Sequence, residues 1–359
     1  MPKTTVIPFG PQHPVLPEPI HLDLVLEDET VVEAIPSIGF IHRGLELLCR
    51  KKPYQDMVYV AERICGICSF IHGLGYSQGI EKIMGIEVPP RSHYLRVFWS
   101  ELSRIHSHLL WLGLTADAAG FESLFHHSWR VREKILDIIE ETTGGRVIFG
   151  VCKVGGVRRD VDNSTLKRIL KELNEIEADY NALARVFKTD YTIRHRFSDV
   201  GVLSGEDAYR VGAVGPTGRG SGLSQDLREL GYAVYNELDF EPVTESAGDC
   251  YARLMVRVRE VNACMDLIRQ SVEKMPEGPV DVKVKGFPEG EFFSRLEQPR
   301  GEVVYYLKSN GTKFLDRFRV RTPTFANIPA LLHMLGGCDL ADVPVIVLSI
   351  DPCISCTER

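Results

Sequence analysis

Two Cys-x-x-Cys pairs lie at opposite ends of this 359-residue chain, and they constrain its fold more than any other feature. The first pair is Cys65 and Cys68, and the second is Cys353 and Cys356 within the closing stretch Asp351–Arg359. Residues i and i+3 project from one face of a helical turn, so both sulfurs of a pair can reach one metal ion. We therefore expect a fold in which the two ends of the chain meet at a metal centre.

Four thiolates suit zinc, an iron–sulfur cluster, or a soft-ligated transition metal such as nickel. A structural zinc site is the first alternative, but its two cysteine pairs usually lie within ~15–20 residues of each other, because the metal staples a small module. This chain is long enough to bury a core of its own. The wide spacing therefore favours a redox metal site over zinc, while thiols with unrelated roles are a third alternative.

The remaining cysteines and the overall charge exclude several other classes of protein. Nine cysteines at irregular spacing do not form a secreted disulfide framework, and a reducing compartment is expected. A net charge of −7 without a basic face argues against nucleic acid as a partner. No apolar signal segment follows Met1, and no apolar run would span a membrane, although contact with a membrane partner stays open. Five cysteines stand alone and are expected to be small buried hydrophobic residues: Cys49, Cys152, Cys250, Cys264 and Cys338.

The hydrophobic pattern is mostly helical. The segment 92–142, interrupted at Gly120, is apolar enough for the core helices of a bundle. Further helical patterns cover residues 43–48, 56–84 with the first cysteine pair, 163–187, 246–274 and 327–335. No internal repeat or linker divides the chain, which favours one domain over residues 1–359.

Strands are expected on the flanks of this bundle. Residues 20–33 alternate as in a hairpin, after a proline-rich extended segment. Residues 302–308 and 313–320 form a second hairpin, because Asn310-Gly311 is a strong turn signal. The apolar run 343–350 is interpreted as a strand that leads to the terminal cysteines. The fold class is therefore mainly α with small β-hairpins (α+β).

Residues around each cysteine pair narrow the choice of metal. Arg63, Cys65, Cys68 and His72 form the pattern R-x-C-G-x-C-x-x-x-H, and Asp351-Pro352 precedes the second pair. Both stretches resemble the nickel-binding signatures of the large, catalytic subunit of nickel–iron hydrogenases. Two such motifs at opposite ends of one chain are specific, whereas one motif alone is not.

The loop Gly10–Pro14, with the sequence GPQHP, is similar to a loop in the quinone-site subunit of respiratory complex I, a relative without the metal cysteines. A chain with both features resembles the membrane-bound, energy-converting hydrogenases (group 4, Ech-type). The resemblance extends over nearly the full length. It implies the hydrogenase large-subunit fold with a helical-bundle core.

The same resemblance implies a nickel–iron centre with carbon monoxide and cyanide on the iron. Cys65 and Cys353 would be terminal nickel ligands, whereas Cys68 and Cys356 would bridge nickel and iron. Dihydrogen would split at an open position on the metals, and a thiolate such as Cys353 or Cys356 could accept the proton. No further cysteine cluster is present, so the chain is expected to hold no iron–sulfur cluster of its own.

Three more residues match family positions near the metals. Glu18 occupies the place of a proton-relay glutamate, although one extra residue separates it from the following histidine; a loop glutamate in solvent is the alternative. Arg300 matches an arginine whose guanidinium covers the open face of the metals, and Asp351 would anchor it. A surface salt bridge is the alternative for this pair.

The motifs assign supporting roles to several other residues. His72 would donate a hydrogen bond to a cysteine sulfur, with a lone core histidine as the alternative, and Arg63 is counted with the cofactor-binding motif. Glu46 matches a magnesium-binding glutamate, but Arg359 stands where relatives have the histidine that completes this site. Magnesium is therefore doubtful, and Arg359 could pair with Glu46. His13 is assigned a role in energy coupling.

The resemblance implies reversible hydrogen oxidation coupled to ion translocation on the cytoplasmic face of the membrane, to which the chain is peripheral. Electrons would pass to an iron–sulfur small subunit and on to ferredoxin, within a complex-I-like assembly of hydrophilic and membrane subunits. A zinc-containing, quinone-reductase-like structural subunit is the alternative function. Relatives lose a C-terminal extension three residues after the last cysteine, so this chain is expected to represent the matured form.

Overall fold

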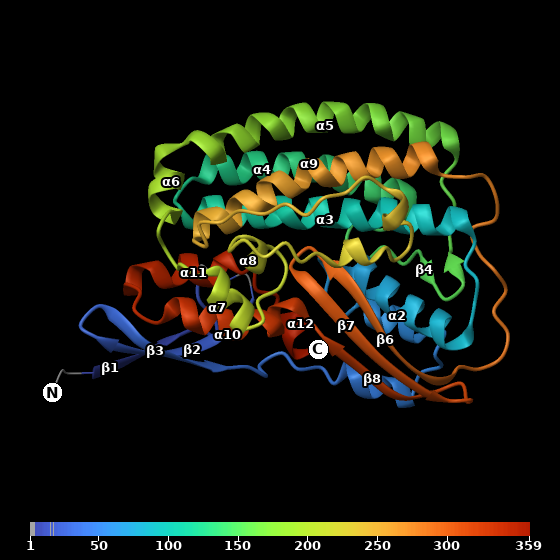
Figure 1. The fold of residues 1–359 in the computed structure, drawn as a ribbon, viewed down its shortest axis with the longest axis horizontal. Coiled ribbons are helices and arrows are strands. Elements are labelled where there is room, and N and C mark those ends of the chain that lie inside the picture. Colours follow the sequence, from blue (N-terminus) through green and yellow to red (C-terminus); the bar gives the residue numbers. More distant parts are fainter. Residues whose placement is uncertain (1–3, 15, 17) are drawn as a thin grey trace.

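The computed structural model describes residues 4–14, 16 and 18–359. Long helices form layers on one side of the molecule (Figure 1), with α4 and α9 packed between α3 and α5. Helix α3 is buried along nearly its whole length, whereas α5 buries one stripe from Leu166 to Phe187 at helical spacing. These helices are α3 (Pro90–Ala118), α4 (Glu122–Thr143), α5 (Asn163–Thr189) and α9 (Cys250–Lys274).

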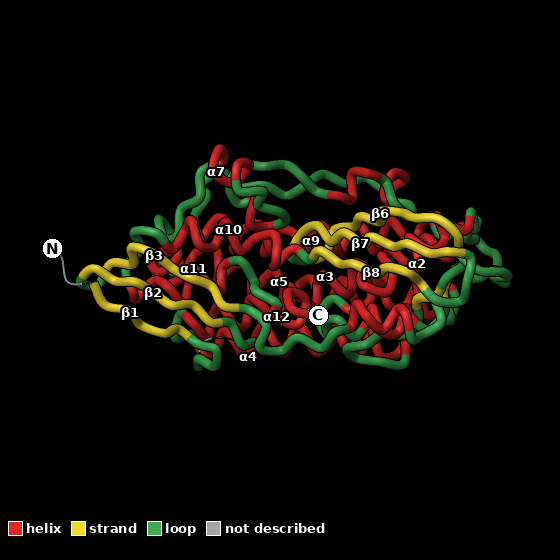
Figure 2. Tube along the Cα trace, turned by 90° about the horizontal axis from the view of Figure 1, so that it is seen from below, coloured by secondary structure: helices red, strands yellow, loops and turns green. Residues whose placement is uncertain are grey.

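Two three-stranded antiparallel sheets lie toward opposite ends of the molecule (Figure 2). Both follow the order of the chain, β1-β2-β3 and β6-β7-β8. Helix α2 (Ser69–Met84) packs against β6 and β7 and starts directly after the first cysteine pair. The strands are β1 (Thr4–Phe9), β2 (His21–Glu27), β3 (Thr30–Ser37), β6 (Glu289–Gln298), β7 (Gly301–Asn310) and β8 (Leu315–Arg321), and the short pair β4 (Cys152–Lys153) and β5 (Gly156–Val157) stands apart.

The C-terminal segment lies between the two sheets, near the middle of the molecule (Figures 1 and 2). It consists of α10 (Pro323–Leu335), α11 (Val343–Ser349) and α12 (Ile354–Glu358). Short helices elsewhere are α1 (Met57–Glu62), α6 (Tyr191–Phe197), α7 (Gly205–Arg210) and α8 (Pro216–Arg219), with 3-10 turns η1 (Leu45–Arg50), η2 (Leu227–Leu230), η3 (Tyr235–Glu237) and η4 (Leu340–Asp342).

The mainly helical α+β fold class expected from the sequence is confirmed, and two local predictions are wrong. The apolar run 343–350 is helix α11 rather than a strand. The first cysteine pair lies in the non-helical turn between α1 and α2 rather than in a helix. Both predicted hairpins are present, and the unexpected strands β1 and β6 extend them to three-stranded sheets. Within the described residues, no helix is both long and apolar enough to cross a membrane.

Candidate metal centre

The first cysteine pair is held in the turn before α2. The backbone N–H of Ile67 donates to Cys65 Sγ at 3.3 Å. Arg43, which the sequence did not single out, donates from its guanidinium to the carbonyls of Arg63 at 2.9 Å and Ile64 at 2.7 Å. The same guanidinium donates to the carbonyl of Ser355 at 3.0 Å. One arginine therefore ties the first cysteine turn to the C-terminal segment.

The second pair is positioned by two threonine side chains at the start of α10. The N–H of Cys353 donates to Thr324 Oγ1 at 3.1 Å, and Thr322 Oγ1 donates to the carbonyl of Cys356 at 3.2 Å. Asp351 has a positive φ of 54°, a conformation that is uncommon for a residue other than glycine. This turn directs the chain from α11 into α12, so that both cysteines face the centre of the molecule.

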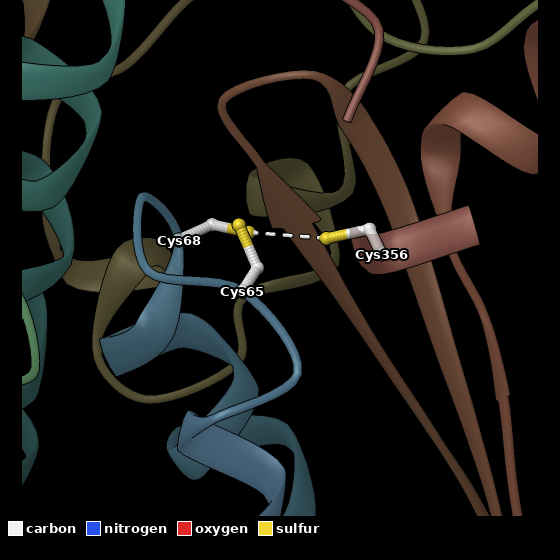
Figure 3. A group of neighbouring side chains, drawn as sticks. All are labelled: Cys65, Cys68 and Cys356. Carbon is white, nitrogen blue, oxygen red and sulfur yellow. Dashed lines mark hydrogen bonds between the residues drawn. The ribbon is translucent and has the colours of Figure 1, made fainter. Parts of the chain in front are cut away.

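The two pairs meet, as the sequence predicts. Cys65 Sγ lies 3.3 Å from Cys353 Sγ, and Cys68 Sγ lies 3.6 Å from Cys356 Sγ. The ligand atoms of Cys65, Cys68 and Cys356 lie within 4.8 Å of one another, and Figure 3 shows their side chains directed toward each other. All four cysteines are buried. Four buried sulfurs at this separation form a soft donor set that fits a thiolate-bound transition metal.

Metal binding would also determine which of these four cysteines are thiols and which are thiolates. Burial, followed by hydrogen bonds that the Cys356 thiol donates to Cys353, Cys65 and Cys68, raises the pKa of this thiol well above its usual range. Burial opposes ionisation of Cys68 as well, but hydrogen bonds from Cys356 and Cys65 lower its pKa to about 6. Thiolates are the metal-binding form, so metal binding would release the remaining thiol protons.

Arg300 and Asp351 form a buried pair beside the cysteines, as the sequence analysis expects. Arg300 Nη2 donates to Asp351 Oδ1 at 2.9 Å, and Arg300 Nε donates to the Asp351 carbonyl at 2.8 Å. Burial disfavours the charge of Arg300, but Asp351 and the thiolates of Cys353, Cys65 and Cys68 raise its pKa well above the usual range. Arg300 Nη1 and Asp351 Oδ2 have no hydrogen-bond partner among the described residues. These free polar atoms next to the sulfurs fit a site that holds a further group.

Glu18 lies against the second cysteine pair. Its Oε2 accepts hydrogen bonds from the backbone N–H of Ile354 and, at 2.9 Å, of Ser355. Its Oε1 accepts from Ser355 Oγ at 3.0 Å and from Cys353 Sγ at 3.7 Å. Burial, followed by the charge of Cys353, raises the pKa of Glu18 to about 7. The carboxyl group can therefore exchange a proton near neutral pH.

A surface cavity of about 450 Å³ adjoins Glu18. Its lining includes His13, whose ring lies against that of Phe9 at a tilt of 32°, with the centroids 4.3 Å apart. The loop that the sequence compares with the quinone-site loop of complex I therefore lies beside the candidate proton carrier. The lining residues are Pro11, Gln12, His13, Pro14, Leu16, Glu18 and Pro19.

His72 contacts the cysteines from the opposite side. Its Nε2 lies 3.3 Å from Cys356 Sγ and 3.0 Å from Gln298 Nε2, and its Nδ1 is hydrogen-bonded to the hydroxyl of Tyr305. Burial lowers the pKa of His72 to about 3, so the imidazole is neutral. If the Tyr305 hydroxyl donates to Nδ1, Nε2 carries the hydrogen, and it can donate to the sulfur when the Gln298 amide turns its oxygen rather than its nitrogen toward Nε2. Tyr305 was missed by the sequence analysis because it belongs to no recognisable motif. Gln298 stands in the motif Gln298-Pro299-Arg300-Gly301 that identifies Arg300, but the sequence analysis assigned no role to it.

Glu46 does not form the site that magnesium would require. Its Oε1 accepts from Arg359 Nε at 2.8 Å, and its Oε2 accepts from Arg319 Nη1 at 2.8 Å. Burial opposes ionisation, but the hydrogen bonds from these arginines lower the pKa of Glu46. The pairing of Glu46 with Arg359 is as expected. Two cations occupy the carboxylate, so these residues do not fit a divalent ion.

Arg63 is the sequence-predicted residue that the structure does not bring to the sulfurs. Its side chain is exposed, and Nη1 donates to the carbonyl of Tyr59 at 3.0 Å. The guanidinium also lies over the Tyr59 ring, 6.0 Å from its centroid. Only the backbone carbonyl of Arg63 contributes near the centre, where it accepts from Arg43.

Fold and site together define a class: a mainly helical chain whose two ends bring four buried cysteines to one point beside a buried arginine. Comparison with known families agrees with this class. Residues 43–114 match the family described as nickel-dependent hydrogenase. Residues 118–287 and 283–359 match the 49 kDa subunit of the respiratory-chain NADH dehydrogenase. The chain belongs to the family that unites nickel-dependent hydrogenases with this complex I subunit.

Individual relatives cover nearly the whole chain. It is 39% identical to the membrane-bound hydrogenase subunit alpha of Pyrococcus furiosus, over 98% of this chain and 87% of that protein. It is 39% identical to the carbon monoxide-induced hydrogenase of Rhodospirillum rubrum, over 99% of this chain and 100% of that protein. It is also 35% identical to a subunit of the F420H2 dehydrogenase of Methanosarcina mazei, over 99% and 97% respectively. The family therefore includes both hydrogenases and proteins named for other oxidoreductase complexes.

Proposed function

We propose that this chain, as one domain over residues 1–359, is the catalytic subunit of a membrane-associated nickel–iron hydrogenase. The reaction is the reversible oxidation of dihydrogen to protons and electrons. The observation that carries the proposal is the convergence of four buried cysteine sulfurs from the two ends of the sequence. Similarity to a membrane-bound hydrogenase subunit and to a carbon monoxide-induced hydrogenase supports it.

In this proposal Cys65, Cys68, Cys353 and Cys356 would all bind nickel, and Cys68 and Cys356 would also bind iron. When bound, the nickel–iron centre, with carbon monoxide and cyanide on the iron, supplies the open position at which dihydrogen is split. Arg300 holds a fixed positive charge beside the sulfurs, which stabilises negative charge that develops there. Asp351 orients that guanidinium through two hydrogen bonds.

Protons leave through Cys353 and Glu18. The Sγ of Cys353 holds the proton first, and Glu18 Oε1 accepts it across the 3.7 Å contact. A carboxyl group whose pKa is about 7 can both accept and release a proton at neutral pH. Release is toward the cavity that Glu18 shares with His13, the residue to which we assign a role in coupling.

Electrons leave through a partner subunit. The relatives are named as subunits of membrane-bound hydrogenase and dehydrogenase complexes, which supports an assembly with other proteins. We propose an iron–sulfur small subunit as the direct partner, ferredoxin as the carrier beyond it, and ion translocation by membrane subunits. The chain would then be peripheral on the cytoplasmic face of the membrane.

The similarity to other oxidoreductase subunits supports an alternative function. The match of residues 118–359 to the complex I subunit and the similarity to a subunit of an F420H2 dehydrogenase favour a quinone-reductase-like structural subunit with zinc at the thiolates. Elemental analysis of the purified complex separates the two functions: equal amounts of nickel and iron support a hydrogenase, and zinc without nickel supports the alternative. Infrared bands of carbon monoxide and cyanide on iron are expected, and a nickel-containing complex without them contradicts the proposed centre.

A further inference from the structure

A second buried cluster of ionisable side chains lies behind the turn that carries Arg300. Its members are all almost completely shielded from solvent, and they come from α3, α8, η2, α9 and β6. Charges in such surroundings are stable only when they are paired and hydrogen-bonded. The members are Glu101, Arg104, His108, Arg219, Asp226, Arg228, Glu260 and Glu297.

On the side of the cluster that contains Glu297, the central cation is the guanidinium of Arg219. Its Nη1 donates to Glu297 Oε1 at 2.8 Å and lies 3.2 Å from Asp226 Oδ2. Its Nη2 donates to Glu260 Oε1 at 2.7 Å. Glu297 Oε2 accepts in addition from the backbone N–H of Leu227 at 3.2 Å. One guanidinium therefore serves three carboxylates.

Arg228 and Arg104 balance the rest of the cluster. Arg228 Nη2 donates to Asp226 Oδ2 at 2.7 Å, and Arg228 Nη1 donates to Glu101 Oε2 at 3.2 Å. Arg104 Nε donates to the same oxygen of Glu101 at 3.3 Å, and Arg104 Nη2 donates to the Glu297 carbonyl at 2.9 Å. Arg104 and Arg228 thus favour the ionised forms of Glu101 and Asp226.

The four carboxyl groups of this cluster differ in how many cations they contact. Glu101, Asp226 and Glu260 each pair with two guanidinium groups, whereas Glu297 pairs with Arg219 alone. Glu260 also lies 2.8 Å from His108, and a further buried guanidinium, Arg257, acts on it from the same helix. Glu297 is therefore the carboxyl group with the least support for its ionised form and the first to take up a proton. Burial, followed by repulsion from Asp226, raises the pKa of Glu297 to about 7, which makes Glu297 the member that holds it.

Glu297 also borders a route to solvent. A cavity of about 250 Å³ is lined by Glu297, Asp226 and Gly215, among others. Gly215 packs directly on the Arg300 turn, because a Cβ at Gly215 would lie 2.4 Å from the Arg300 carbonyl oxygen. The cavity therefore reaches one side of the Arg300 turn. The other side of this turn faces the cysteines. Its lining is Val214, Gly215, Gln225, Asp226, Leu227, Glu229, Leu230, Arg295, Glu297 and Glu302.

We propose that Glu297 exchanges a proton with solvent through this cavity, and that its protonation state controls the strength of the hydrogen bond between the end of β6 and Arg219. Ionised Glu297 accepts a charge-assisted hydrogen bond from Arg219, and the neutral acid loses most of that strength. The same strand end presents Gln298 to His72 and leads to Arg300, which binds Asp351. Glu297 is thus a positioning residue for the cysteine centre; this second part rests on the proposed function.

The groups that face Glu297 come from each neighbouring element. Arg104 on α3 and Arg219 on α8 favour its ionised form, and Asp226 before η2 opposes it. The Tyr232 hydroxyl accepts a long hydrogen bond from the Glu297 backbone N–H at 3.4 Å, and Glu260 on α9 acts through Arg219. Arg295, Glu229 and Glu302 line the cavity.

The proton exchange is tested on the purified full chain by infrared spectroscopy of the carbonyl stretch of protonated carboxyl groups, in H2O and D2O, between pH 5 and pH 9. Wild-type protein is expected to lose the buried carboxyl signals of Glu18, Glu62 and Glu297 as the pH rises through about 7, and subtracting the variant titration from the wild-type titration isolates the Glu297 signal. Glu297→Gln should lack this signal. Glu302→Gln is the matched control, because Glu302 lines the same cavity but is paired with Arg295 and Arg321; it should retain the signal. An unchanged titration in Glu297→Gln overturns the proposal.

The positioning role is tested on the assembled complex through the pH profile of hydrogen turnover. Glu297→Gln should flatten the profile near pH 7, and Glu297→Asp should restore its shape. A uniform loss of turnover at every pH in Glu297→Gln, with no recovery in Glu297→Asp, shows a purely structural residue and overturns the coupling. If the wild-type complex has no hydrogenase activity, the proposed function fails, and the infrared titration still decides the proton exchange.

Discussion

At the scale of single residues, the two cysteines of the C-terminal pair have different neighbours. Cys353 contacts the carboxyl group of Glu18, which can exchange a proton near neutral pH. Cys356 contacts His72, whose imidazole is buried and neutral. A proton taken up by the sulfurs therefore has a titratable acceptor on one side and a fixed hydrogen-bond donor on the other. This asymmetry supports the proposed proton transfer through Cys353.

Glu18→Gln should leave the metal content unchanged and slow proton transfer, because the amide cannot carry a proton. A positioned acid–base group contributes roughly 10²–10⁴-fold, so hydrogen–deuterium exchange catalysed by the complex should fall by at least about 10²-fold. Ser355→Ala removes a hydrogen bond to the same carboxylate but keeps the acid, and it should retain most of the activity. Full exchange activity in Glu18→Gln would falsify the relay.

Cys65→Ser should abolish nickel binding and hydrogen uptake, because a neutral hydroxyl replaces one of four soft ligands. Metal analysis and hydrogen uptake of the assembled complex are the measurements. Cys338→Ser is the matched control, since Cys338 is half-buried in another part of the chain, and it should bind metal as the wild type does. Equal nickel contents in the two variants would refute the ligand assignment.

Glu62 should make the stability of the chain depend on pH. Its carboxyl group is buried, and neither oxygen has a hydrogen-bond partner within the described residues. Burial raises its pKa from 4.5 to about 7, and the charges of Arg63 and Arg158 compensate only partly. The folded state therefore favours the neutral acid. Its contribution to stability is fully present below pH 4.5 and is lost as the pH rises through about 7.

Glu62→Gln should remove this dependence. The free energy of unfolding of the wild type, relative to the variant, should fall by up to ~3 kcal/mol between pH 5 and pH 8, because one pKa unit corresponds to about 1.4 kcal/mol. Urea unfolding at both pH values gives the difference. The same comparison with Glu122→Gln, at an exposed position of α4, should show little change. A constant difference for Glu62→Gln excludes a buried, titrating carboxyl group there.

The sequence alone identifies site residues that lie in a recognisable motif. It misses residues that reach the site through contacts between distant parts of the chain. The four cysteines, Arg300 and Asp351 stand in motifs, and the structure brings them together. Gln298 and Tyr305 reach His72 from more than 200 residues away. Nothing in the local sequence marks Tyr305, and Gln298 stands in the motif of Arg300 without an assigned role. Arg63 shows the converse, because a motif position does not determine where the side chain points.

At the scale of helices and strands, long periodic segments were predictable and short apolar runs were not. The core helices α3 and α4 lie where the pattern places them. The run Val343–Ile350 is apolar except for Ser349, and such a run does not distinguish a buried strand from a buried helical turn. Pro344 near the start of α11 is compatible with a helix because the first turn needs no donor from its N–H groups. Packing against α3, α9 and α10 therefore determines that this segment is a helix rather than a strand.

The short helix α8 depends on one glycine. Gly215 precedes it with φ 64° and ψ −148°, a conformation that side chains other than glycine rarely adopt. A Cβ there would also meet the backbone of Arg300 and Gly301 at 2.4 Å. Gly215→Ala should destabilise the chain by about 3 kcal/mol or more and displace the Arg300 turn. Urea unfolding and nickel content measure the two effects.

Gly212→Ala is the control for this substitution. Gly212 also has a positive φ, of 69°, but a Cβ there would meet no atom within 4 Å. Gly212→Ala should lower the free energy of unfolding only by the conformational cost of a positive φ at alanine, about 1–2 kcal/mol. Its metal content should be normal. Equal costs for the two variants would mean that the contact with Arg300 does not matter.

At the scale of the whole molecule, the fold closes the chain on itself. Glu358 accepts hydrogen bonds from the backbone N–H groups of Ile41 and, at 2.6 Å, of Gly39. Arg359 pairs with Glu46 at 2.8 Å, and Arg43 reaches Ser355. Polar contacts thus fix the last helix against the first part of the chain. Folding must bring these ends together before the four sulfurs can share a metal.

Metal binding at the proposed centre should therefore stabilise the entire chain and not only its site. The metal cross-links Cys65 and Cys353, which are 288 residues apart, and it holds thiolates that burial otherwise disfavours. Metal-loaded protein should unfold at a higher denaturant concentration than metal-free protein, by a free energy on the order of several kcal/mol. The increment should vanish in Cys356→Ser and persist in Cys338→Ser. Coincident unfolding curves for loaded and metal-free wild-type protein would show that the closure depends on the protein contacts alone.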